Sequence, residues 1–108
     1  MKIDEAAITK EREEAWIGDA VLALYVREWI LKEKSALDGE AFIRFTSNDF
    51  LRFQGNPTSV EAEIGRVYQE EGLTAGFTWI EEKLLPRFLT REKQLAARDQ
   101  RGRKKRSK

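Results

Sequence analysis

Cysteine and histidine are both absent from this 108-residue chain. Their absence excludes disulfide bonds, zinc fingers, thiol nucleophiles and imidazole acid–base catalysis together. Catalysis by this chain would therefore have to use carboxylates, lysine, hydroxyl groups or a bound hard metal ion. No apolar run reaches the roughly 18 uninterrupted residues of a membrane span, and the first residues lack the apolar segment of a signal peptide. We therefore expect a cytoplasmic protein with no membrane partner.

Proline is also scarce, with two residues, and no segment alternates apolar and polar residues as a strand would. The chain is long enough for one domain with a core of its own. Apolar positions at helical spacing, joined by short connections, predict an all-α, compact helical bundle. We expect a short lead-in helix followed by four main helices, at about 4–10, 13–34, 39–53, 57–71 and 75–97.

Local signals mark the ends and breaks of these helices. Asn56 and Pro57 form a strong start signal, with asparagine as N-cap and proline in the first helical position. Gly72 is a C-cap candidate for the same helix. The polar residues 46–48, Thr-Ser-Asn, are able to break the second helix in two. Pro86 should kink or split the last helix, because proline lacks a backbone donor and crowds the preceding turn.

The net charge of +1 conceals an uneven distribution. Residues 98–108 hold seven of the 20 Lys and Arg residues but one of the 19 acidic residues. The helical domain, residues 1–97, is therefore acidic, whereas the tail, residues 98–108, is basic and has nothing apolar to bury, which predicts disorder. Such a tail is suited to nucleic-acid phosphates, and a solvated or protein-binding terminus is the alternative.

Asp19 is the most unusual residue of the chain. From Ala15 to Leu31 nearly every residue is apolar, which predicts a helix buried around most of its circumference. A carboxylate in such a helix needs a cap, a cation or a metal, because its unpaired burial is costly. Gly18, directly before it, permits the close approach of another helix.

A partner for Asp19 is available on the helix expected at 57–71. Glu61 shares a stripe with Thr58 and Gly65 at helical spacings of three and four. If the two helices cross at their glycines, Asp19 and Glu61 face one another. Two carboxylates without histidine form a donor set suited to Mg²⁺, or to Mn²⁺ in its place. A second interpretation stays open, in which Asp19 caps or pairs locally and Glu61 lies on a solvated face.

Three segments resemble the motifs of the ribonuclease III family, in the family's order. Residues 17–22, Ile-Gly-Asp-Ala-Val-Leu, resemble its signature helix. Residues 60–65, Val-Glu-Ala-Glu-Ile-Gly, with Tyr68 and Gly72 after them, resemble its second motif. Residues 45–51, Phe-Thr-Ser-Asn-Asp-Phe-Leu, lie between the two and are similar to a third conserved helix. The resemblance covers about residues 14–85.

The chain also departs from the usual family pattern. Ala15 and Thr58 stand where most members have metal-binding carboxylates, and Arg12 replaces a further glutamate. The Mini-ribonuclease III branch shows a similar reduction, so the chain resembles that branch most. Asp19 and Glu61 are 42 positions apart, fewer than the family usually has. We therefore expect a bundle that is shortened between the two motifs.

The resemblance implies a metal-dependent endoribonuclease, a hydrolase that acts on double-stranded or structured RNA such as ribosomal RNA precursors. Its cofactor would be Mg²⁺, or Mn²⁺. Asp19 and Glu61 would be both the catalytic and the metal-binding residues, and Thr58 is placed to position a water. The implied assembly is a symmetric homodimer, with double-stranded RNA lying across both active sites.

RNA and a second copy of the chain are thus the expected partners. The signature helix would supply much of the dimer interface, with Trp16, Tyr25 or Trp29 as anchors. The same aromatic residues are equally suited to the core of the monomer. The residues expected to bind the RNA backbone are all basic: Arg44, Arg52, Arg101, Arg103, Lys104, Lys105 and Arg106.

Two other functions stay open. The loss of two of the four family carboxylates fits a non-catalytic RNA-binding or ribosome-associated protein on the same fold, and the basic tail suits that role. A helical interaction domain that binds no RNA is the third interpretation. The presence of both Asp19 and Glu61 favours activity, because a site without function would have no need of either.

Overall fold

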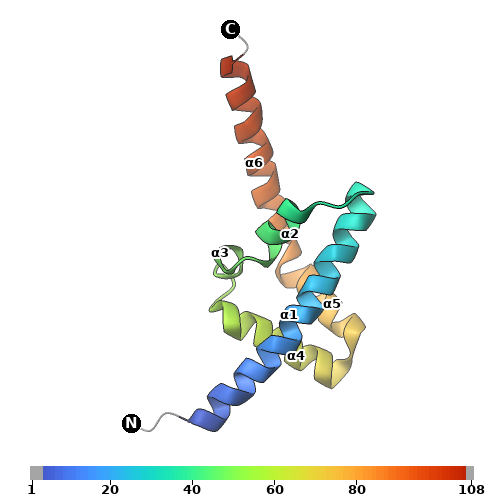
Figure 1. Ribbon diagram of the computed structural model, residues 1–108, viewed down its shortest axis with the longest axis vertical. Coiled ribbons are helices and arrows are strands. Elements are labelled where there is room, and N and C mark those ends of the chain that lie inside the picture. The colour runs from blue at the N-terminus through green and yellow to red at the C-terminus, as the bar shows by residue number, and fades with distance from the viewer. Residues whose placement is uncertain (1–3, 107–108) are drawn as a thin grey trace.

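The computed structural model describes residues 4–106, and the side chains of residues 4–100. Every regular element in this part of the chain is a helix, which confirms the predicted all-α class (Figure 1). None of these helices is long and apolar enough to cross a membrane. The helices in chain order are α1 (Glu5–Lys34), α2 (Gly39–Thr46), α3 (Asn48–Leu51), α4 (Pro57–Glu71), α5 (Leu73–Lys83) and α6 (Leu85–Arg106).

α1 is a single helix of 30 residues, so the predicted separate lead-in helix was wrong. Asp4 caps its start by accepting a hydrogen bond of 3.1 Å from the Ala7 amide. Its end is marked by Ser35, which adopts a left-handed conformation with φ of 55°. The residues between the two predicted helices include neither glycine nor proline, so nothing interrupts the backbone hydrogen bonds there.

The two predicted breaks are confirmed. Ser47 separates α2 from α3, and its hydroxyl oxygen accepts a hydrogen bond of 3.1 Å from the Phe50 amide, which caps α3. Leu84 separates α5 from α6, and Pro86 occupies the first turn of α6. In that turn the missing N–H of proline has no helical partner to lose, so splitting the predicted helix relieves its conflict with the preceding turn.

The ends of α4 agree with the prediction, whereas the end of α6 does not. Asn56 accepts a hydrogen bond of 3.2 Å from the Ser59 amide at the start of α4, and Gly72 follows its last residue. α6 was expected to end near Ala97 but continues to Arg106. Arginine, lysine, glutamine and alanine are good helix formers, so propensity alone carries the helix into the basic segment.

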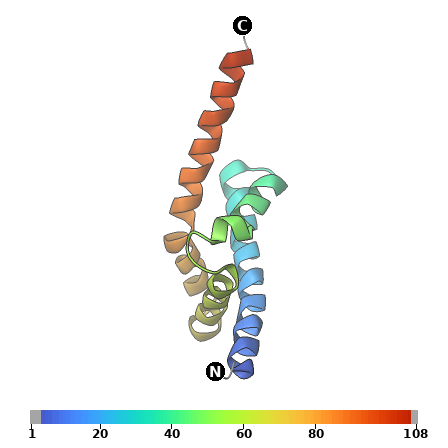
Figure 2. The ribbon, with the colours of Figure 1, turned by 90° about the vertical axis from the view of Figure 1, so that its left-hand side faces the viewer.

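The core is aromatic at its centre. Phe45 of α2 and Phe88 of α6 pack with ring centroids 4.3 Å apart, and Phe50 of α3 contacts both edge-on. Leu22 of α1 and Ile80 of α5 are also fully buried. Figure 2 shows α1 along one side of the molecule, α4 and α5 beside it, and α6 projecting beyond them to the C-terminus. Phe53 is 38% exposed because the chain leaves the helix after Leu51.

One side of α1 lies outside this core, contrary to the expectation that the helix is buried around most of its circumference. Tyr25 is buried, and Trp29 packs against the core cluster. Trp16, in contrast, is 80% exposed. Of the three aromatic residues considered as dimer anchors, two therefore belong at least partly to the core of the monomer.

Candidate functional site

α1 and α4 cross in backbone contact at two glycines. A Cβ atom built on Gly18 would overlap the carbonyl oxygen of Glu61 and lie 2.8 Å from the Gly65 amide nitrogen. A Cβ atom built on Gly65 would overlap the carbonyl oxygen of Glu14. Neither position has room for a side chain, so the two glycines fix the distance between the helices. The crossing that the sequence predicted conditionally is present.

An ion pair between a buried glutamate and an exposed arginine lies beside the crossing. Glu14 of α1 is 8% exposed, and its Oε2 accepts a hydrogen bond of 3.3 Å from Nε of Arg66 on α4. One turn earlier, Glu11 Oε2 accepts a hydrogen bond of 3.3 Å from the Ser59 hydroxyl. Both contacts connect the two helices, and on α1 both lie on the N-terminal side of Gly18.

The crossing brings Asp19 and Glu61 together. Asp19 follows Gly18 directly and is exposed, so the expectation of a carboxylate buried within an apolar helix was wrong. Glu61 is half-buried on α4 and lies within hydrogen-bonding reach of Asp19.

The burial at the crossing and the proximity of Asp19 shift the pKa of Glu61. Burial at the crossing, a hydrogen bond with Asp19 and repulsion from the Asp19 charge together raise it from 4.5 to about 7. No basic side chain counters these effects on Glu61 in the described part of the chain. Glu61 therefore takes up a proton more readily than a free glutamate does, unless a cation binds in its place.

Such a pair is able to do two kinds of chemistry. A carboxyl group that titrates near pH 7 can exchange protons with a bound water. Two adjacent carboxylates also supply oxygen ligands to a hard divalent cation, which would relieve their mutual repulsion. No group of three or more acidic side chains placed to hold a metal occurs within the described residues, so this site offers a pair.

Two positions near the pair, Ala15 and Thr58, lack the carboxylates that most ribonuclease III family members have there. Ala15 is buried one turn before Asp19, at the packed side of α1. Thr58 is exposed one turn before Glu61 on α4. The hydroxyl group of Thr58 is thus on the accessible surface of the same helix as Glu61, and the spacing of three places it on a neighbouring part of the helix face.

Comparison of the chain with protein-family models, with curated proteins and with solved structures finds no match. The ribonuclease III resemblance therefore rests on the three sequence segments alone.

The residues expected to contact RNA occupy different situations. Arg44 is held by Glu92 of α6 through two hydrogen bonds, of 2.8 Å from Nε and 2.7 Å from Nη2. This ion pair connects α2 to α6, so Arg44 is engaged within the fold. Arg52 is exposed at the end of α3. The remaining five lie in the last turns of α6 and have side chains outside the described part: Arg101, Arg103, Lys104, Lys105 and Arg106.

α6 also has a basic face that was not predicted from the sequence. Arg87, Arg91 and Arg98 are spaced by four and seven residues, which places them on one side of the helix. Arg91 and Arg98 line one shallow groove, and Arg87 and Arg91 line a second. The spacing was visible in the sequence, but an expected helix end at Ala97 separated Arg98 from the other two.

Proposed function

We propose that this protein is a metal-dependent endoribonuclease of the ribonuclease III type that cuts double-stranded or structured RNA in the cytoplasm. The observation that carries the proposal is the meeting of Asp19 and Glu61 where α1 and α4 cross at Gly18 and Gly65. All four residues belong to the two segments that resemble the family's motifs. Acid pairs in accessible positions, with a strongly shifted pKa, are typical of functional sites.

Asp19 and Glu61 fit the divalent cation that the resemblance implies. Both offer hard oxygen donors, and the raised pKa of Glu61 shows that the pair lacks a compensating positive charge. When bound, Mg²⁺ supplies an activated water and neutralises charge on the phosphate oxygens. Asp19 and Glu61 would hold the ion and orient the attacking water. The water oxygen would bond to phosphorus as the bridging P–O bond breaks, and its proton would pass to the departing oxygen, which leaves one phosphate end and one hydroxyl end.

The arginines of α6 supply a surface for the RNA backbone. Arg87, Arg91 and Arg98 lie along one side of α6 toward the basic end of the chain, and Arg91 also pairs with Asp49 of α3 at 3.3 Å. A-form RNA is recognised largely through its phosphates and 2′-hydroxyl groups, which suits a helical edge with no base-reading loop.

The symmetric homodimer is part of the same proposal. Trp16, Leu24 and Leu31 are 80%, 40% and 49% exposed, and their spacings of eight and seven residues place them along one side of α1. Ala20 lies exposed between Trp16 and Leu24 on this side, and the exposed Arg27 interrupts the apolar residues between Leu24 and Leu31. A second copy of the chain would cover this apolar stripe by a self-complementary contact.

Cleavage of a double-stranded RNA, measured with and without Mg²⁺, tests the enzymatic proposal. We expect metal-dependent product from the wild type and a loss of at least about 100-fold in rate for Asp19→Asn and for Glu61→Gln, since each removes one of two ligands. Glu63→Gln, exposed on the same helix, is the matched control and should cut normally. Equal rates in all four proteins would contradict the assignment of the site.

A non-catalytic RNA-binding protein is the second candidate, and the basic face of α6 favours it independently of the carboxylates. RNA binding by the wild type without any cut product would establish this alternative. Replacement of Arg87 and Arg91 would then weaken binding, whereas Asp19→Asn would leave it unchanged.

A further inference from the structure

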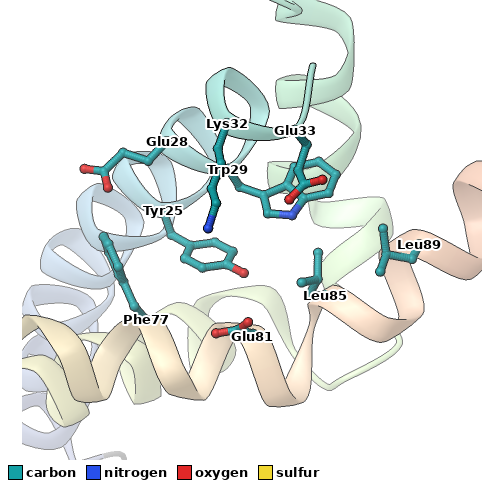
Figure 3. Close-up of a pocket in the computed structure, with 9 residues that line it drawn as sticks. All are labelled: Tyr25, Glu28, Trp29, Lys32, Glu33, Phe77, Glu81, Leu85 and Leu89. Atoms are coloured by element: carbon teal, nitrogen blue, oxygen red, sulfur yellow. The ribbon is translucent and has the colours of Figure 1, made fainter. Parts of the chain in front are cut away.

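A pocket of about 530 Å³ opens between α1, α5 and the start of α6. Its volume is within the range of small-molecule sites. Figure 3 shows side chains from all three helices converging on it. Neither Asp19 nor Glu61 lines this pocket, so it is separate from the candidate catalytic pair.

Aromatic and aliphatic side chains form the walls of the pocket. Tyr25 and Phe77 pack edge-to-face with ring centroids 5.3 Å apart, and Trp29 lies further along α1. Leu85 and Leu89 of α6 form the opposite wall (Figure 3). An apolar group would find contact on several sides here, and the aromatic rings offer electron-rich faces to a cation.

The charges at the pocket are mainly negative. Glu28 and Glu33 of α1 and Glu81 of α5 line it, against Lys32 alone. Figure 3 shows Glu81 at its floor, with Lys32 and Glu33 above. Neither Lys32 nor any of the three glutamates forms an ion pair with a described residue.

The Tyr25 hydroxyl group points into this pocket without a partner. Tyr25 is 8% exposed, yet its hydroxyl makes no hydrogen bond to any described residue. Figure 3 shows the hydroxyl directed toward the space beside Glu81. Burial, with the negative charges of Glu81 and Glu33, raises the pKa of Tyr25 to about 12. The hydroxyl oxygen is itself open to the pocket rather than sealed in the core, so a ligand in the pocket is able to donate a hydrogen bond to it.

We propose that this pocket binds a primary ammonium group carried on an apolar body. Glu33 and Glu81 face the positive charge, and the Tyr25 hydroxyl oxygen accepts a hydrogen bond from the ammonium group. The apolar body lies against Trp29, Phe77 and Leu85. A free amine and the lysine side chain of a partner protein share this chemistry, so both are potential sources of the ligand.

Calorimetric titration of the full chain, without RNA or metal, tests the site. Benzylamine represents a free amine, and benzyl alcohol is its neutral counterpart of similar shape. A short acetylated peptide with one lysine, and the same peptide with that lysine acetylated, represent the protein source. We expect a dissociation constant of about 1 mM or lower for benzylamine or for the lysine peptide, and no measurable heat from either neutral probe.

Three variants locate the binding. Glu81→Gln changes an exposed residue and should weaken binding about tenfold, because it removes a charged partner. Tyr25→Phe keeps the buried ring and should weaken binding about fivefold through the lost hydrogen bond. Glu82→Gln, the adjacent exposed residue of α5 that does not line the pocket, should bind as the wild type does.

Each alternative outcome would overturn the proposal. Equal binding of benzyl alcohol would show a merely apolar pocket, and equal weakening by Glu82→Gln would show a general effect of surface charge. An absence of heat from both cationic probes would exclude the site. Because the titration contains no RNA or metal, none of these results bears on endonuclease activity.

Discussion

At the scale of single residues, Gly18 and Gly65 determine where the two candidate catalytic groups meet. Each glycine faces a backbone carbonyl of the other helix. Substitution of either glycine by alanine would therefore force that helix to move. Asp19 directly follows Gly18 in the chain, and Glu61 supplies the carbonyl that Gly18 faces across the crossing. Their proximity is therefore a consequence of backbone packing rather than of an attraction between the carboxylates.

Gly18→Ala should destabilise the protein by about 2–3 kcal/mol, because its methyl group would overlap the Glu61 carbonyl and force α1 and α4 apart. Urea unfolding followed by circular dichroism measures the change. Gly39→Ala is the matched control, since a Cβ atom at Gly39 meets nothing within 4 Å, and it should change stability by less than about 0.5 kcal/mol. Equal stabilities of the two variants would contradict the close crossing.

Glu61 should make stability depend on pH between its unfolded and folded pKa values. Because the folded pKa is raised from 4.5 to about 7, the folded state holds the proton more tightly. The contribution of Glu61 is therefore fully present below pH 4.5, declines as pH rises to about 7, and is absent above it.

With the discount for partial exposure, the wild type should lose about 1–2 kcal/mol relative to Glu61→Gln across this range. Urea unfolding at several pH values, with a chelator present, measures the difference between the two proteins. Parallel stability profiles would show that Glu61 titrates normally.

At the scale of helices, local chemistry explains which features could be predicted from the sequence. The Asn56–Pro57 start, the break at Ser47 and the split before Pro86 each depend on a few adjacent residues, so they could be read directly. The glycine crossing could be anticipated because Gly18 and Gly65 have no side chain to keep the helices apart.

Features that depend on distant parts of the chain could not be read in this way. The exposed side of α1 is decided by which helices reach it, and an apolar sequence does not contain that information. The Arg44–Glu92 pair joins residues 48 positions apart, and no local pattern distinguished Arg44 from a free arginine. The length of α6 reflects helix propensity within a basic segment whose composition had suggested disorder.

The Arg44–Glu92 pair should contribute to the attachment of α6. Its geometry is bidentate, and hydrogen bonding with Glu92 raises the pKa of Arg44. Glu92→Gln should lower the free energy of unfolding by about 1 kcal/mol at low salt and by less at high salt. Asp99→Asn, exposed further along α6, should have no measurable effect. A loss that does not depend on salt would argue against an electrostatic cause.

At the scale of the whole molecule, the surface has two distinct regions. The apolar stripe of α1 is uncovered, and the basic residues gather along α6. A molecule that leaves a tryptophan 80% exposed on the side of α1 that also carries two exposed leucines has a surface suited to a protein partner. A second copy of the chain would place two Asp19–Glu61 pairs in one assembly, as a double-stranded substrate with two backbones requires.

Trp16→Glu should therefore weaken self-association by at least about tenfold, because it places a charge at the most exposed aromatic residue of the stripe. Sedimentation velocity over a range of protein concentrations measures the dimerisation constant. Leu73→Glu introduces the same charge at a residue of α5 that is 40% exposed and lies outside the stripe, and it should associate as the wild type does. A wild-type chain that stays monomeric at every concentration would remove the dimer from the proposal, and equal weakening by both variants would place the interface elsewhere.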